Sequence, residues 1–308
     1  MLPRPFSCVF LLMVALSEAA VSATPAKFDA VALLDPERPE AARATQLQIL
    51  KAAADRGEHA ARCLLGRLGL QRQLAPGAAK SGAYGDIGAY LNACLLGGDL
   101  DSMLVLAEAE LHADKPLEAM IWVQAYLQLA KVFGSEVVNS ASPYKAGLIA
   151  RIERGYHGRR PENEEVQEYV AGLLAKFGER IVEQARAGGG EWTAAILPPQ
   201  PNAELARVSR GSVLVGRFTR EISDARDELS FATVLLAVDE SGRVAETLTI
   251  EGYPELRSVR KLIKTTSAER FNNVPAGTGL RHTTMQLYVD NHAYDLMPDA
   301  PADRRPAN

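Results

Sequence analysis

Hydrophobic residues recur every three to four positions through most of residues 45–187, the spacing of one face of an α-helix. This spacing predicts a series of helices, at residues 46–57, 60–70, 83–96, 102–111, 116–133, 143–160 and 162–187. Beyond about residue 200, hydrophobic and polar residues alternate instead, as they do in strands with one buried face. We expect strands at 212–219, 231–238, 244–250 and 283–290, and one further helix at 255–270. The pattern therefore predicts a helical half followed by a smaller half of mixed structure.

The change of periodicity coincides with residues that interrupt regular structure. Gly188, Gly189 and Gly190 precede it, and the proline-rich run 198–201 follows them. The predicted fold class is an all-α helical-repeat solenoid followed by a small α+β domain, in which an antiparallel sheet packs against one helix. The predicted division is a signal peptide (1–23), a helical-repeat domain (24–187), a linker (188–203), an α+β domain (204–297) and a disordered tail (298–308).

The first 23 residues have the pattern of a secretory signal. Arg4 supplies a positive charge, residues 6–16 form an apolar run, and Val21-Ser22-Ala23 resembles a signal-peptidase site. The apolar run is shorter than the roughly 20 residues of a membrane-spanning helix. We therefore expect an exported, periplasmic protein with no stable transmembrane segment after cleavage, and we expect Cys8 to be removed with the signal.

Two cysteines, Cys63 and Cys94, remain in the expected mature chain. An even number of cysteines in an oxidising compartment permits a disulfide. Cys63 lies early in one predicted helix and Cys94 late in the next, so antiparallel packing would bring them to the same level. The alternative is two buried thiols at helix contacts, where cysteine packs well.

The helical half contains an internal similarity with an offset of about 41 residues, which relates Gly57 to Gly98. Ala53-Ala54 and Gly57 at one helix end, followed by Ala61 and Leu65-Gly66 in the next helix, resemble the Sel-one-like repeat, a relative of the tetratricopeptide repeat. Residues 116–122, which include Ala119 and Trp122, resemble the other helix of that repeat. The resemblance implies a stacked scaffold that binds proteins.

The C-terminal half resembles the C-terminal domain of the TonB energy-transducer family. The residues that carry the resemblance are the hairpin 238–244 (Val-Asp-Glu-Ser-Gly-Arg-Val), Pro254-Glu255-Leu256 at the start of a helix, and Arg270-Phe271 followed by Val274-Pro275-Ala276. The family binds an extended segment of its partner by adding a strand, so the resemblance implies peptide binding at a sheet edge. The candidate edge is the last strand, with Thr284, Gln286 and Tyr288 as candidate binding residues.

Charge and motifs restrict the chemistry that we expect. A formal net charge of −4 gives no reason to expect nucleic-acid binding. The five histidines are scattered, and no His-Glu-x-x-His, Cys-x-x-Cys or Gly-x-Ser-x-Gly motif is present. We therefore expect no catalytic, cofactor-binding or metal-binding residues, and partners that are envelope proteins or extended peptide segments.

Three functions remain open at this point. The first is a periplasmic interaction scaffold in which the repeats and the TonB-like module bind partners without catalysis. The second is an energy-transducer-like component of TonB-dependent outer-membrane transport, anchored by an uncleaved N-terminus. The third is an envelope enzyme whose site is assembled from residues that are distant in the sequence.

Overall fold

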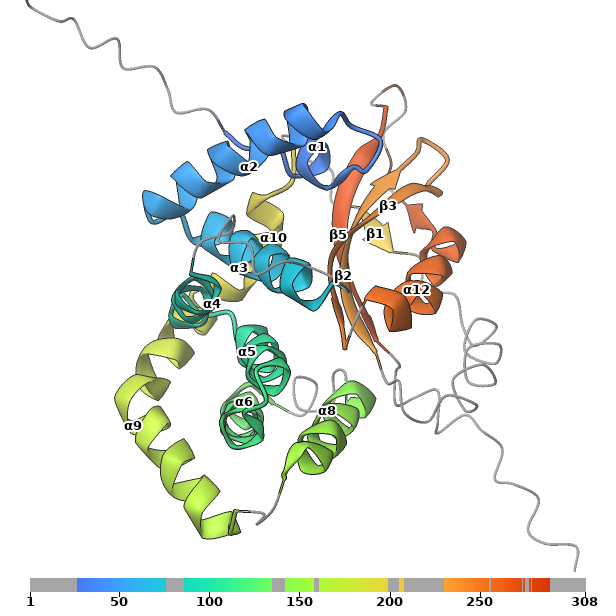
Figure 1. Ribbon diagram of the computed structural model, residues 1–308. Coiled ribbons are helices and arrows are strands. Elements are labelled where there is room, and N and C mark those ends of the chain that lie inside the picture. Colours follow the sequence, from blue (N-terminus) through green and yellow to red (C-terminus); the bar gives the residue numbers. More distant parts are fainter. Residues whose placement is uncertain are drawn as a thin grey trace, which may run out of the picture.

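The computed structural model describes residues 27–75, 86–134, 142–157, 161–198, 205–207, 230–254, 256–272, 274, 277 and 279–288. The expected signal peptide, the strand expected at 212–219 and the expected tail lie outside these residues. The described part is mostly helical, with a small antiparallel sheet near the C-terminus (Figure 1). The coarse prediction of an all-α region joined to a small α+β region is confirmed.

Helices that follow one another in the chain pack side by side through the first half. They are α1 (Ala30–Leu34), α2 (Glu40–Asp55), α3 (His59–Leu74), α4 (Ile87–Leu96), α5 (Asp101–His112), α6 (Pro116–Phe133) and α8 (Ser142–Gly155). The long helix α9 (Asn163–Arg186) then runs back along the outside and contacts α6 and α4 (Figure 1).

Local sequence determines where several of these helices begin and end. The Asp86 side chain caps α4 by accepting a hydrogen bond from the backbone N–H of Ala89 at 3.0 Å. Pro116 occupies the start of α6, where its missing N–H removes no helical hydrogen bond. Gly57 and Gly98 follow α2 and α4 with φ of 93° and 107°. A residue with a Cβ would be strained in this conformation, whereas glycine is not.

The Leu65-Gly66 pair lies where α3 meets α4. Leu65 is buried, and a Cβ added to Gly66 would lie 2.9 Å from Cδ2 of Leu91 and 3.2 Å from its backbone nitrogen. The glycine therefore allows the two helices to approach more closely than any larger residue would.

The sheet has the strand order β3-β2-β5 and is antiparallel throughout. Its strands are β2 (Phe231–Val238), β3 (Val244–Tyr253) and β5 (Arg281–Tyr288), and a separate two-stranded pair joins β1 (Ala206–Arg207) to β4 (Phe271–Asn272). Every residue of the central strand β2 is buried, which means that both faces of the sheet are covered.

Helix α12 (Leu256–Lys264) covers one face of the sheet, and the helical half covers the other (Figure 1). Val234, Leu236 and Val259 form part of the core on the α12 side. On the other side, Leu235 and Ile250 share a core with residues of α2, α3 and α4. The sheet and the helices are thus joined by a continuous apolar interface.

The segment after α9 makes close contacts at the glycine run. It forms the short helices η2 (Gly189–Glu191) and α10 (Trp192–Ala195), and Trp192 is buried. A Cβ on Gly189 would lie 1.8 Å from the carbonyl oxygen of Gly97, so the two backbones touch here. Gly189 is therefore required by backbone packing, whereas a Cβ on Gly97 would lie 2.2 Å from Cε1 of the His59 ring.

Most predicted elements lie within a few residues of the observed ones. Strand β2 has the predicted bounds, the return strand β3 extends three residues further than predicted, and β5 begins two residues earlier. The helix predicted at 255–270 ends at Lys264 and continues as a 3₁₀ turn, η3 (Thr265–Ala268). Helices α1 and α10 and the short pair of strands β1 and β4 were not predicted, because segments of two to five residues carry no measurable periodicity.

Candidate functional site

A buried arginine occupies the junction between the helices and the sheet. Arg67 projects from α3 and is 1% exposed. Its Nη2 donates to Oδ2 of Asp99 at 2.6 Å, and its Nε donates to Oε1 of Glu251 at 3.1 Å. The guanidinium also lies over the ring of Trp192, 4.7 Å from the centroid. One cation therefore binds the helical half and the sheet at once.

On the sheet side, the Glu251 carboxylate has a partner for each oxygen. Thr233 donates its hydroxyl to Oε1 at 2.7 Å, and Tyr253 donates its hydroxyl to Oε2 at 3.1 Å. Glu251 is 2% exposed, so these bonds replace the water that the buried charge has lost.

On the helix side, Asp99 lies in the turn between α4 and α5. Its Oδ2 accepts hydrogen bonds from the backbone N–H and the hydroxyl of Ser102, as a capping residue does at the start of a helix. The same oxygen binds Arg67, and it lies 3.5 Å from Sγ of Cys94. Asp99 thus binds the start of α5 and also neutralises the charge of Arg67.

A pocket of about 260 Å³ opens beside this network. Its lining residues come from α3, the α4–α5 turn, the segment after α9 and all three strands of the sheet: Arg67, Asp99, Gly190, Trp192, Thr193, Thr233, Glu251, Thr284, Met285 and Gln286. Such a volume is close to the lower end of the ~300–1,000 Å³ range of small-molecule sites. It suits a single side chain or a small fragment.

Asp101, the first residue of α5, adds a further carboxylate at the rim. Its Oδ2 accepts a hydrogen bond from Nε2 of Gln286 at 2.8 Å. Burial, and then the charge of Asp99, raise the pKa of Asp101 to about 6. Asp101 therefore changes its charge near neutral pH, next to the strand that lines the pocket.

Lys145 on α8 is a further cation, and its charge interacts with that of Asp101. The lysine is 3% exposed and its Nζ lies 5.2 Å from the ring centroid of Tyr126. Burial lowers the pKa of Lys145 to about 8. Lys145 therefore loses its proton, and with it its positive charge, as the pH rises through about 8.

Behind Arg67, the structure joins Cys63 of α3 and Cys94 of α4 in a disulfide with a Cα–Cα distance of 5.0 Å. His59 lies on the other side of the bond, with its Nε2 3.7 Å from Sγ of Cys63 and 2.9 Å from the carbonyl oxygen of Gly189. These three residues are the one group of metal-type ligands in the described part of the chain. Sulfurs that are bonded to each other are not thiolates, so the disulfide state offers no metal ligand there except His59.

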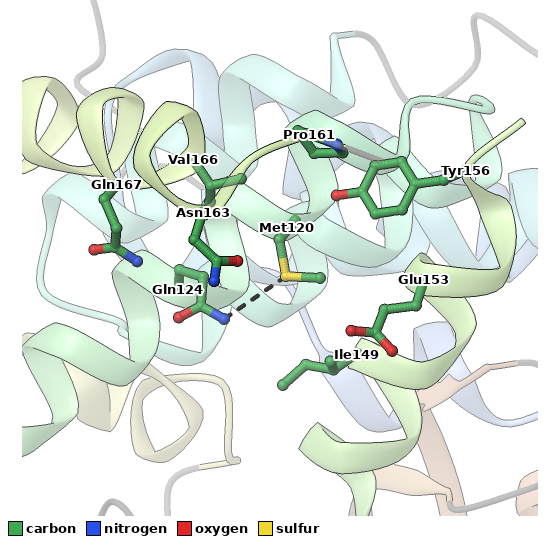
Figure 2. Close-up of a pocket in the computed structure, with 9 residues that line it drawn as sticks. All are labelled: Met120, Gln124, Ile149, Glu153, Tyr156, Pro161, Asn163, Val166 and Gln167. Atoms are coloured by element: carbon green, nitrogen blue, oxygen red, sulfur yellow. Dashed lines mark hydrogen bonds between the residues drawn. The ribbon is translucent and has the colours of Figure 1, made fainter. Parts of the chain in front are cut away.

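A second pocket, of about 310 Å³, lies between α6, α8 and the start of α9 (Figure 2). Met120, Ile149 and Val166 give it apolar walls, and Glu153 and Tyr156 come from the end of α8. Residues 158–160, next to it in the chain, lie outside the described residues. Among the lining residues that the structure describes, Glu153 is the one carboxylate and no cation is present.

The structure places the predicted binding residues at one edge of the sheet, since β5 pairs only with β2 within the described residues. Thr284 and Gln286 line the first pocket, on the side of the sheet that the helices cover. The side chain of Tyr288 is not among those that the structure describes. Of the predicted residues, Thr284 and Gln286 are therefore together at one pocket, and Cys63 and Cys94 lie directly behind it.

Sequence reasoning did not find Arg67, Asp99 or Glu251. A signal for Arg67 existed, because it follows Cys63 and Leu64 at helical spacing and so lies on the apolar side of its helix. Glu251 had no such signal. Strand β3 contains a bulge, where Val234 pairs with Thr249 but Thr233 pairs with Glu251. The extra residue turns Glu251 to the same face as Ile250, against the simple alternation.

Comparisons with known protein families, with curated proteins and with solved structures found no match. In the part of the chain that the structure describes, no helix combines the length and apolar character required to span a bilayer.

Replacing Arg67 with Met should reduce the free energy of unfolding by about 3–5 kcal/mol, because Asp99 and Glu251 would remain buried without their cation. Urea unfolding at pH 7 measures the change. Arg56→Met is the matched control, since the Arg56–Glu58 pair is exposed and should contribute less than about 1 kcal/mol. Equal effects of the two substitutions would contradict the assigned role of Arg67.

Asp101→Asn should stabilise the protein above pH 6 but not near pH 4. A carboxyl group whose pKa is raised from 3.8 to about 6 binds its proton more tightly in the folded state than in the unfolded state. The wild type therefore loses stability as the pH rises through this window, whereas the variant has no such titration. We expect a gain of about 1–2 kcal/mol at pH 7.5, reduced by the lost charge at the helix start. Parallel pH profiles of unfolding for the two proteins would show that Asp101 titrates normally.

Proposed function

We propose that this chain is an exported cell-envelope protein that binds an extended peptide segment of an envelope partner along β5, without catalysis. In this proposal the helical half is a scaffold of Sel-one-like repeats, and the C-terminal half is a TonB-like peptide-binding module. The observation that carries the proposal is the edge position of β5 beside a polar pocket.

Strand β5 offers a long edge for pairing. It is eight residues long, and all eight pair with β2 on one side. Within the described residues, no strand pairs with its other side. The outward N–H and C=O groups of such an edge are the groups that an added strand binds.

The opposite edge of the sheet is less accessible. At the start of β3, Arg243 forms a bridge with Arg270, and the N–H of Phe271 donates to the carbonyl of Gly242 at 2.8 Å. Further along, the Thr247 and Thr266 hydroxyls are hydrogen-bonded at 2.7 Å. The segment from α12 to β4 thus contacts the first part of β3, which leaves β5 as the more open edge among the strands that the structure describes.

The helical half supports the scaffold part of the proposal. Its consecutive helices pack in sequence order, as they do in stacked helix pairs, and Gly66 serves close packing at the position that the repeat pattern indicates. A disulfide between Cys63 and Cys94 is typical of the oxidising compartments that exported proteins reach.

The export step predicts a defined mass. The protein recovered from bacterial periplasm should begin at Thr24, and reduction should add the mass of two hydrogens. Mass spectrometry of the intact protein, with and without reductant, makes the measurement. A full-length, membrane-bound product would contradict the proposal and favour the transducer-like alternative, and an unchanged mass on reduction would show that Cys63 and Cys94 are free.

Peptide binding predicts different effects of proline at two adjacent positions of β5. Successive residues of an edge strand direct their N–H groups to opposite sides, one toward the neighbour and one outward. Of Thr283→Pro and Thr284→Pro, one should therefore lose a β2–β5 hydrogen bond and stability. The other should keep its fold but lose at least about tenfold in peptide affinity.

The measurement uses acetylated decapeptides, selected from a displayed random library on the mature chain. Fluorescence anisotropy gives their affinities, and amide NMR of the wild type locates the bound peptide. If the folded proline variant binds as well as the wild type, or if the amide shifts lie outside β5, the proposed binding edge is wrong.

A further inference from the structure

The pocket beside β5 adds a chemical requirement to the proposed function, on which the following inference rests. Three consecutive residues of β5, Thr284, Met285 and Gln286, line this pocket. Thr284 and Gln286 lie on the face that the helical half covers, whereas the side chain of Met285 packs with the core on the α12 side. The pocket therefore runs along β5, the strand to which a peptide would be added.

An added strand would direct every second side chain into this region. The side chains of a paired strand follow the same alternation as those of β5, so one set lies on the face of Thr284 and Gln286. That face is the one that the helical half covers, with Trp192 and Thr193 at the pocket wall. A peptide side chain of this set would be directed toward the pocket.

Carboxylates outnumber cations in and around the pocket. Asp99 and Glu251 line it, and Asp101 is bonded to the lining residue Gln286. Among the lining residues that the structure describes, Arg67 is the one cation, and Lys145 is a further cation whose charge interacts with that of Asp101. Three carboxylates thus face two cations, and the excess is negative once Asp101 is ionised.

Neither Arg67 nor the neighbouring histidine can reverse this sign. Arg67 already binds Asp99 and Glu251, so its charge is neutralised before a ligand arrives. His282, two residues before Thr284 on the same face of β5, has a pKa lowered by burial, which disfavours its charged form. A carboxylate of the peptide would therefore add a negative charge to a pocket in which negative charges already outnumber positive ones.

We propose that the pocket receives the lysine or arginine side chain of the bound peptide, so that the partner segment carries a basic residue facing the helical half. An ammonium or guanidinium group at the pocket would lie near the carboxylates of Asp99 and Glu251 and near the Asp101–Gln286 pair. The Trp192 ring and the threonine hydroxyls of Thr193 and Thr284 would contact the aliphatic stem and the polar head.

The test is a peptide array bound by the mature, disulfide-bonded chain. The acetylated, amidated decapeptides carry Lys, Arg, norleucine, Gln or Glu at a central position, with flanking residues drawn at random from Ser, Thr, Val and Gln. Lys or Arg should bind at least about tenfold more tightly than norleucine and Gln, and Glu most weakly, and added salt should reduce the preference.

Two lysine variants test the location. Thr284→Lys brings an ammonium to the pocket from the chain itself, and should reduce affinity for the Lys peptide at least about tenfold more than it reduces affinity for the norleucine peptide. Asn272→Lys, at an exposed position of β4, makes the same charge change outside the pocket and should have no such effect.

The outcomes separate this inference from the function on which it rests. Decapeptides that bind at β5 with equal affinity whatever their central residue would overturn the basic pocket and leave peptide addition intact. Binding of n-butylammonium alone at the pocket, without any peptide binding at β5, would overturn the proposed peptide binding and, with it, the inference that rests on it. A preference for Glu would reverse the sign of the pocket and overturn the inference.

Discussion

The structure depends on the neutralisation of one buried cation. Arg67 is fully desolvated, and a guanidinium in that position is tolerated only if carboxylates replace the lost water. Asp99 comes from the helical half and Glu251 from the sheet, so the requirement can be met only when both halves are in place. Burial of the apolar interface favours the association of the halves, and Arg67 adds an ion pair to each of them.

The surroundings of Arg67 are arranged to hold it still. The disulfide between Cys63 and Cys94 joins the two helices that flank it, and Cys94 lies 3.6 Å from its Nη1. Trp192, in the segment after α9, covers the guanidinium from the other side. Close backbone contact between Gly97 and Gly189 brings that segment into position. The guanidinium is thus enclosed by residues of α3, α4 and the segment after α9.

Periodicity predicted the architecture well and the site poorly, for a physical reason. Long helices such as α6 and the central strand β2 repeat their pattern over many residues, so their bounds were close to those observed. The site is built at exceptions to the pattern. Glu251 reaches the helices through a bulge, and Trp192 lies in a single helical turn after a glycine run. Asp99 lies in a turn, and aspartate is common in turns whether or not it belongs to a site, so its position gave no signal.

The coupling between the halves has a consequence for recognition. A ligand that contacts Thr284 and Gln286 on one side and Trp192 on the other binds the sheet and the helical half together. Its binding free energy then adds to the stability of their interface, because only the assembled interface offers the complete pocket. The bond between Gln286 and Asp101 extends this contact to the first turn of α5. If a segment is added at β5 as proposed, its binding is therefore coupled to the packing of the helical half, and such coupling is reciprocal.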